Sequence, residues 1–95
     1  MRIVWTRRYL QELASIGDYI GARNPRVAAR VVNEIHSKTG KLLSANPFIG
    51  RAGEIRGTRE LVIPGTPYIV AYRVGEDQID ILFVQHGARE WPDEV

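Results

Sequence analysis

The chain has 95 residues, of which 44% are hydrophobic and 25% are charged, and it contains no cysteine. This composition is ordinary for a globular protein, so it excludes disorder along the whole chain, and the length suits one small domain over residues 1–95. The missing cysteines exclude a disulfide scaffold and thiolate chemistry, and a net charge of +2 is only a mild bias toward acidic partners.

Neither a secretory signal nor a metal site is expected. The opening segment, MRIVWTRRYL, carries charges where a signal peptide needs an apolar run. No stretch approaches the roughly 20 apolar residues of a membrane-spanning helix. Two histidines without cysteines do not make a metal site. We therefore expect a cytoplasmic protein without a cofactor.

The first half of the chain predicts a short strand followed by two helices. Residues 2–5 are β-prone, and Thr6 can cap a helix whose apolar residues recur at helical spacing: Tyr9, Leu13, Ile16 and Ile20. Asn24 and Pro25 suit the N-cap and first position of a second helix, which runs to about residue 44. Because few residues join the two helices, we expect an antiparallel hairpin.

The second half of the chain predicts a glycine-containing loop and then three strands. The loop spans residues 45–57, and the strands span residues 58–63, 68–74 and 78–86. The short connections PGTP and GED predict antiparallel pairing of consecutive strands. The predicted fold class is α+β in the order β-α-α-β-β-β, with the helical hairpin packed on one face of a small, mainly antiparallel twisted sheet.

Each of these three strands carries a cationic or titratable side chain. Alternation places Ile79, Ile81 and Phe83 on one face of the last strand, and we expect this apolar set to meet the helices. The polar residues can then fall together on the uncovered face, where guanidinium groups suit phosphate or carboxylate. They are Arg59, Arg73 and His86. The alternative is a solvated face whose charges suppress edge-to-edge aggregation.

Several motifs, taken together in their order and spacing, resemble the RelE/ParE superfamily of bacterial toxins. The motifs are Gly50-Arg51, Gly57-Thr58-Arg59-Glu60-Leu61, Tyr72-Arg73 and His86-Gly87-Ala88-Arg89. The resemblance implies the toxin half of a type II toxin–antitoxin system. It also implies a cognate antitoxin, ParD-like or similar, that is encoded nearby and whose flexible segment folds on the toxin.

The resemblance leaves two targets, because RelE-like members cut mRNA on the ribosome and ParE-like members poison DNA gyrase. The segment GRAGEIRG lacks the lysines of RelE-like nucleases, and no tyrosine follows Tyr72. Glu54, Arg59 and His86 resemble the Glu, Arg and His of YoeB-type nucleases, so they are catalytic candidates under that alternative. The ending QHGAREWPD resembles ParE-like sequences more closely. We expect gyrase inhibition, with mRNA cleavage as the alternative and another or lost target as a third possibility.

Two further sets of residues are predicted to bind partners. The candidates for binding the target or a phosphate are Arg51, Arg59, Arg73, Arg89 and Trp91. The candidates for binding an acidic, amphipathic antitoxin segment are Leu13, Ile16, Ile20, Arg23 and Arg30. Structural roles are the alternatives: Arg51 can bond its own loop, Arg89 can pair with an acidic tail residue, Trp91 can pack near the terminus, and His86 can bond the backbone.

Overall fold

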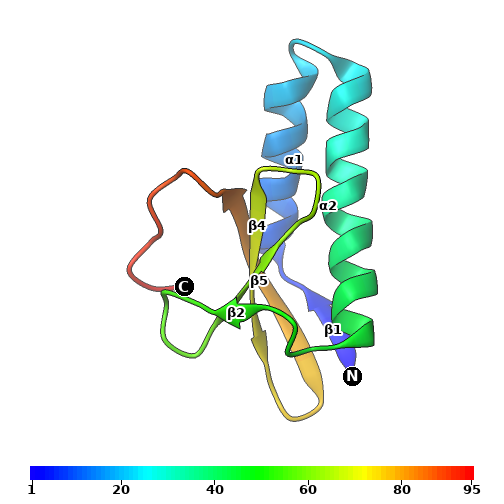
Figure 1. Ribbon diagram of the computed structural model, residues 1–95. Helices are drawn as coiled ribbons and strands as arrows, with labels where there is room; N and C mark the ends of the chain where they lie inside the picture. Colours follow the sequence, from blue (N-terminus) through cyan, green and yellow to red (C-terminus); the bar gives the residue numbers. More distant parts are fainter.

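The computed structural model describes all 95 residues, Met1–Val95, and places two helices beside a twisted sheet (Figure 1). The helices are α1 (Arg7–Gly21) and α2 (Pro25–Ala45). The strands are β1 (Arg2–Trp5), β2 (Arg51–Ala52), β3 (Arg59–Val62), β4 (Tyr68–Val74) and β5 (Gln78–His86). The predicted α+β class and element order are confirmed, and the short strand β2 is an addition to them.

Both helices begin at the predicted caps. The Thr6 side-chain oxygen accepts a hydrogen bond from the Tyr9 N–H, and the Asn24 side-chain oxygen accepts one from the Val27 N–H. Pro25 occupies the first position of α2, where its missing N–H has no helical partner to lose. Neither helix combines the length and hydrophobicity that a membrane-spanning helix needs.

The sheet has five strands in the order β1-β5-β4-β3-β2. The first strand of the chain lies parallel to the last, and every other neighbouring pair is antiparallel. The two halves of the chain are therefore tied together by β1, which pairs with β5 across more than 70 residues of sequence. The prediction of a mainly antiparallel sheet is confirmed.

A β-bulge in β5 interrupts the regular alternation of its side chains between the two faces of the sheet. The pairing with β4 passes over Leu82, so Leu82 and Phe83 both pack on the face of the sheet away from the helices. After the bulge, Val84 points back into the helix-facing core. The predicted helix-facing position is correct for Ile79 and Ile81 but wrong for Phe83.

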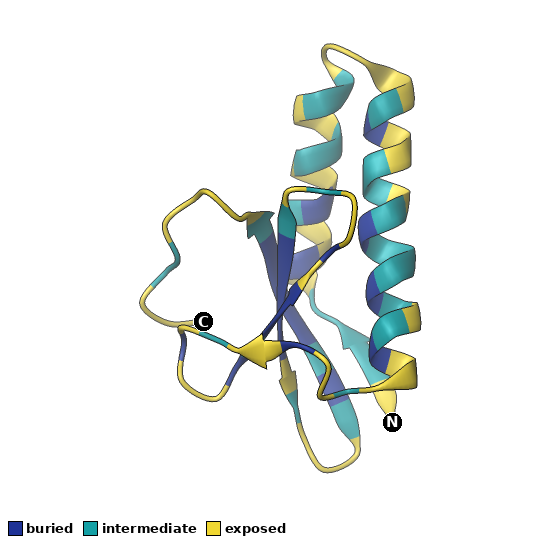
Figure 2. Ribbon diagram, in the orientation of Figure 1, coloured by how far each residue is buried: buried dark blue, intermediate teal, exposed yellow.

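The sheet is consequently buried on both faces. The main core lies between the sheet and the helices, and its members are Tyr9, Leu13, Ile35, Leu43, Leu61, Ile63, Val70, Tyr72, Ile79, Ile81 and Val84. A smaller core on the opposite face joins Ile55, Ala71, Leu82 and Phe83, with Trp91 packed against it. Figure 2 shows the buried strands between exposed outer helix surfaces and a largely exposed C-terminal segment.

Candidate functional site

The three polar strand residues do not share a face, which corrects the expectation of one cationic cluster. Arg73 lies on the face away from the helices, opposite Asp80 on β5. Arg59 pairs with Tyr72 and His86 pairs with Tyr68, and both tyrosines belong to the helix-facing side. Alternation along β4 therefore separates Arg73 from the other two.

Arg59 and His86 share a face but lie far apart on it. Their partners in β4 are Tyr72 and Tyr68, four residues apart along the strand, which is about 13 Å at the usual rise. The two residues also lie on opposite sides of β4, which adds about 10 Å across the sheet. The Cα atoms are thus separated by about 16 Å, and the two side chains make hydrogen bonds to different loops, Arg59 to the loop before β2 and His86 to the turn after β5.

Arg59 holds the loop that precedes β2. One guanidinium nitrogen, Nη1, donates to the carbonyl oxygens of Gly50 (2.8 Å) and Phe48 (3.3 Å), and the guanidinium lies over the Phe48 ring. The Tyr72 hydroxyl accepts from the Gly50 N–H (2.9 Å) and donates to the Pro47 carbonyl (2.8 Å). These contacts give Arg59 and Tyr72 a shared structural role.

Tyr72 also explains why a glycine occupies position 50. A Cβ atom there would lie 2.6 Å from the Tyr72 hydroxyl oxygen and 2.8 Å from the Glu60 carbonyl oxygen. Burial raises the pKa of Tyr72, while the Gly50 N–H and the Arg59 charge oppose that rise. The neutral hydroxyl therefore keeps the proton that it donates to the loop.

Arg51 and Glu54 converge on a buried carboxylate, Glu60. Arg51 Nε donates to Glu60 Oε1 at 3.0 Å, Arg51 Nη2 lies 3.0 Å from the same oxygen in an ion pair, and the Glu54 N–H donates to Oε2 at 2.9 Å. Because the Glu60 side chain is only 4% exposed, these contacts compensate its lost hydration. The Glu54 carboxylate itself is exposed and contacts neither Arg59 nor His86.

His86 is bound to the backbone of the turn that follows β5. Its Nδ1 accepts from the Ala88 N–H at 3.0 Å, so the neutral ring carries its proton on Nε2. The Arg89 N–H donates to the His86 carbonyl, and the ring stands edge-on to Tyr68 with centroids 5.6 Å apart. The Arg89 and Arg73 guanidinium groups make no ion pair and no hydrogen bond within the chain.

A groove of about 560 Å³ lies between α1 and the ends of β4 and β5. Its lining combines apolar, aromatic and polar side chains: Glu12, Ser15, Ile16, Tyr19, Tyr68, Val84, Gln85, His86 and Arg89. Burial raises the pKa of Tyr68, and the electrostatic effect of the neighbouring Tyr19 raises it further, so the Tyr68 hydroxyl stays protonated. The groove therefore offers aromatic walls, a neutral hydroxyl and one free guanidinium.

Beside this groove, the Glu12 carboxylate pairs with a backbone N–H at the edge of β5. The sequence did not predict this role. Its Oε1 accepts from the Val84 N–H at 3.1 Å, and its Oε2 accepts from Arg8 Nε at 3.3 Å. The bonded N–H belongs to the part of β5 that extends beyond β1. The sequence offers one signal for this pairing, which is that Glu12 lies next to Leu13 of the apolar stripe.

The predicted antitoxin-binding residues divide between the core and the surface. Leu13 packs inside the main core, whereas Ile16 lines the groove and Ile20 is half-buried. Arg23 and Arg30 are exposed near the turn of the helical hairpin. Trp91, predicted to contact the target, packs edge-on against Phe83 with ring centroids 5.2 Å apart.

Comparison with known proteins identifies the family. The family described as "ParE toxin of type II toxin-antitoxin system, parDE" matches residues 3–91. The chain belongs to the ParE toxin family. The predicted resemblance to the RelE/ParE superfamily is thereby confirmed, and the chain is a toxin of a type II toxin–antitoxin system.

Relatives of this ParE-family toxin match over almost their whole length. Protein Y4kP of Sinorhizobium fredii is 45% identical over 91 residues, covering 96% of this chain and 93% of the relative. Toxin RelE2 of Caulobacter vibrioides is 32% identical over 88 residues, covering 93% of this chain and 97% of the relative.

Two solved structures have similar folds. A chain of the chromosomal ParDE system from P. aeruginosa matches with a TM-score of 0.83 and 30% identity, over 90% of this toxin and 95% of that chain. A chain of the RelBE2 toxin–antitoxin complex from Mycobacterium tuberculosis matches with a TM-score of 0.56 over the same shares. Because the second match is only 22% identical, it shows a similar fold and nothing more.

Proposed function

We propose that this ParE-family toxin inhibits DNA gyrase and does not cut mRNA. The observation that carries the proposal is the separation of Glu54, Arg59 and His86, the only acid–base machinery that the sequence offers for a nuclease. Cleavage by 2′-hydroxyl attack needs a base, an acid and a cation within hydrogen-bond reach of one phosphate. Here the Cα atoms of Arg59 and His86 are about 16 Å apart by sheet geometry, and their side chains make hydrogen bonds to two different loops.

The hydrogen bonds that these side chains make within the fold also support a non-nucleolytic activity. Arg59 donates to two carbonyl oxygens, and His86 Nδ1 accepts from the Ala88 N–H. Moving either toward a shared phosphate would break contacts that hold the loop before β2 or the turn after β5. A binding protein needs no such movement, because it can use the exposed face as it stands.

We propose that the target contacts come from the free cations and the C-terminal segment. Arg73 and Arg89 have guanidinium groups without partners in the chain, so they can bind carboxylate or phosphate. Arg51 and Arg59 contribute to the target surface mainly by holding their loops. Trp91 is half-buried and positions the exposed tail that follows it.

The proposed antitoxin, ParD-like or similar, binds the groove beside α1 and continues along the helical hairpin. Ile16 and Ile20 supply apolar contacts, while Arg23 and Arg30 favour an acidic segment. Coupled folding on such a surface can give nanomolar affinity in spite of the ordering cost. Calorimetry with the adjacently encoded protein should give nanomolar binding, which micromolar binding or an unchanged circular dichroism of the partner would contradict.

The 32% identity to a toxin named RelE2 favours mRNA cleavage as a second candidate function. The discriminating variant is His86→Gln on translating ribosomes. If the chain is a nuclease, loss of the imidazole should slow cleavage by about 10²–10⁴-fold, since it removes a general acid or base. Under the gyrase proposal the unsubstituted chain cuts no mRNA, and His86→Gln keeps its toxicity. Both proposed targets imply a cytoplasmic site of action.

A further inference from the structure

The outer face of α2 carries a stripe of cationic and neutral polar side chains. At 3.6 residues per turn, the stripe falls within about 80° of the helix circumference, opposite the core positions Ile35 and Thr39. Its members, called the α2 stripe below, are Arg26, Arg30, Asn33, Ser37, Lys41 and Ser44. All of them except Ser37 are exposed, and none is acidic.

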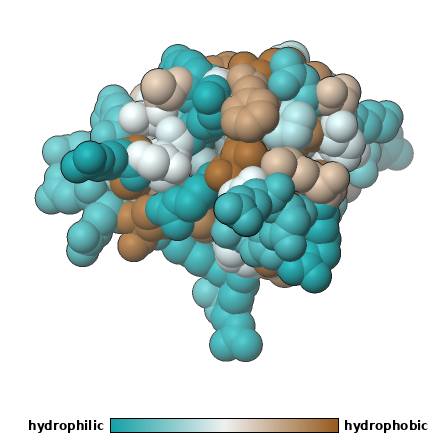
Figure 3. Space-filling model, turned by 90° about the horizontal axis from the view of Figure 1, so that it is seen from below, coloured by the Kyte–Doolittle hydropathy of each residue, from teal (hydrophilic) through white to brown (hydrophobic).

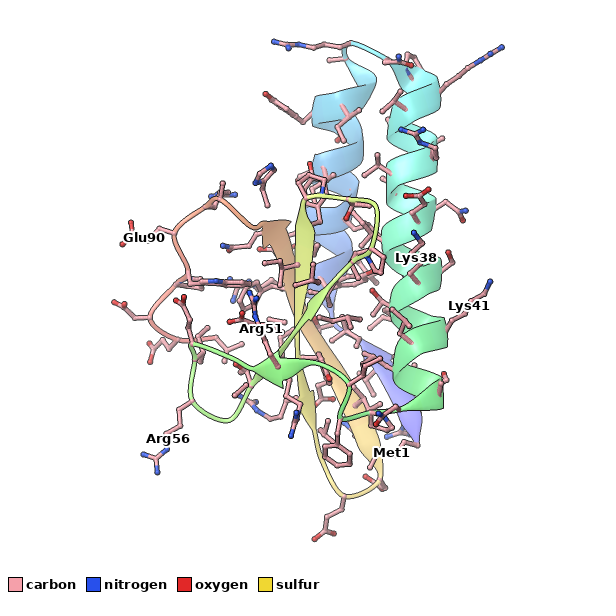
Figure 4. All side chains as sticks on the ribbon, viewed as in Figure 1. Met1, Lys38, Lys41, Arg51, Arg56 and Glu90 are labelled. Atoms are coloured by element: carbon pink, nitrogen blue, oxygen red, sulfur yellow. The ribbon has the colours of Figure 1, made fainter.

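The positive charge of the molecule is concentrated on this helix. α2 has four cationic side chains and one carboxylate, so its net charge of +3 exceeds the +2 of the whole chain. The carboxylate, Glu34, lies 4.0 Å from Lys38 beside the stripe. Arg26, Arg30 and Lys41 make no side-chain ion pair or hydrogen bond within the chain. Figure 4 shows Lys41 pointing away from the molecule, so these donors are free for a ligand.

This placement of charge lowers the stability of the helix itself. Arg26 and Arg30 are four residues apart, so two like charges face each other across one turn. Arg26 also lies in the first turn of α2, which holds no acidic residue, although the helix dipole favours carboxylates there. Residues that break local rules in this way are expected at functional sites, where a ligand compensates the cost.

The chemistry of the α2 stripe fits the phosphate backbone of DNA. Arginine, lysine, asparagine and serine side chains all donate to phosphate oxygens. Arg26 and Lys41 are about 22 Å apart along the helix axis, which corresponds to about six base pairs of a duplex. None of the exposed large hydrophobic residues lies on α2, so a protein partner would find no apolar anchor there. By contrast, Figure 3 shows apolar patches at the end of the molecule opposite the hairpin turn.

We propose that the α2 stripe binds the phosphate backbone of duplex DNA, without regard to base sequence, while the toxin is bound to gyrase. The inference rests on the proposed inhibition of gyrase, because DNA held by gyrase is then within reach of the bound toxin. Arg73, a proposed target contact, lies on the sheet face away from the helices. The toxin can therefore contact the enzyme and its DNA from opposite sides. Because Arg30 is also proposed to contact the antitoxin, the variants that test the stripe are made at Arg26 and Lys41.

Fluorescence anisotropy of the full chain with a labelled duplex of about 20 base pairs tests the binding directly. For three phosphate contacts, the logarithm of the binding constant should fall with the logarithm of the salt concentration at a slope of about −2.7. Arg26→Gln and Lys41→Gln should each reduce this slope by about 0.9 and weaken binding by about fivefold at about 50 mM salt. Glutamine keeps the helix propensity of the residues it replaces.

Arg56→Gln is the matched control for both variants. It removes the same charge from an exposed side chain of the loop before β3, which Figure 4 shows on the other side of the molecule from Lys41. It should weaken binding by less than about twofold. Absence of binding at about 50 mM salt, or equal losses in all three variants, overturns the inference. Binding that is several-fold tighter to an RNA duplex of the same length assigns the stripe to RNA and also overturns it.

The inhibition of gyrase by the same variants separates this inference from the proposed function. The chain with both Arg26→Gln and Lys41→Gln should require about fivefold more toxin than Arg56→Gln for the same inhibition of supercoiling. Equal inhibition by the two would overturn the role of the α2 stripe and leave the inhibition of gyrase intact. If the unsubstituted chain binds DNA through the stripe but does not inhibit gyrase, the proposed function fails and the DNA contact stands.

Discussion

Replacing Phe83 with alanine should remove a large share of the stability of the fold. The side chain is fully buried, packs edge-on against Trp91 at 5.2 Å, and carries the Arg8 guanidinium 4.5 Å from its ring centre. Truncations of this kind cost about 3–5 kcal/mol, against a total of about 5–15 kcal/mol for a domain. At about 4–8 °C per kcal/mol, the melting temperature should fall by at least about 12 °C.

A double-mutant cycle in urea then tests on which face Phe83 lies. Phe83→Leu and Trp91→Ala remove the same contact, so their costs should fall short of additivity by about 0.5 kcal/mol or more. Phe83→Leu and Ile35→Val act on opposite faces, so their costs should add within about 0.5 kcal/mol. Coupling of Phe83 to Ile35 and not to Trp91 would refute the bulge-based assignment. Leu82→Ala, at a 9% exposed position, should cost less than Phe83→Ala.

Tyr9→Phe tests the effect of burying Tyr9, and Gly50→Ala, with Gly40→Ala as its control, tests the loop before β2. Burial raises the pKa of Tyr9 above its usual value of 10.0, so the unfolded chain loses this proton first as the pH rises. The contribution of Tyr9 to the free energy of unfolding should be fully present below about pH 10. Above that pH it should fall by about 1.4 kcal/mol per pH unit. Urea titrations of Tyr9→Phe should show the shallower alkaline slope, and an unchanged slope would contradict the assignment. Gly50→Ala should cost about 1–3 kcal/mol, because its Cβ meets the Tyr72 hydroxyl. Gly40→Ala, whose nearest neighbour is 3.8 Å away, should be neutral or stabilising in thermal melts, and equal losses would argue against the steric reason.

Local chemistry made most of the elements predictable. The caps Thr6 and Asn24 and the regular apolar stripe of α1 carry their information in neighbouring residues, so both helices begin where expected. The boundaries of β4 and β5 follow from runs of β-prone residues between turn signals. Strand β2 has only two residues and owes its existence to pairing with β3, which no local pattern reveals.

The candidate site was less predictable because it depends on strand register. The bulge at Leu82 has no signal in the sequence, yet it turns Phe83 and Val84 to the opposite faces from those that alternation predicts. Arg59 reaches carbonyl oxygens of a loop about ten residues earlier, and that contact appears only when the loop is folded. The family was recognisable from motif order, which needs no knowledge of register.

The most direct test of the central claim is the supercoiling of relaxed plasmid by purified DNA gyrase in the presence of this toxin. We predict that the toxin inhibits supercoiling and that the adjacently encoded antitoxin restores it. Undiminished supercoiling at toxin concentrations that cleave mRNA on translating ribosomes would contradict the account and establish the nuclease alternative.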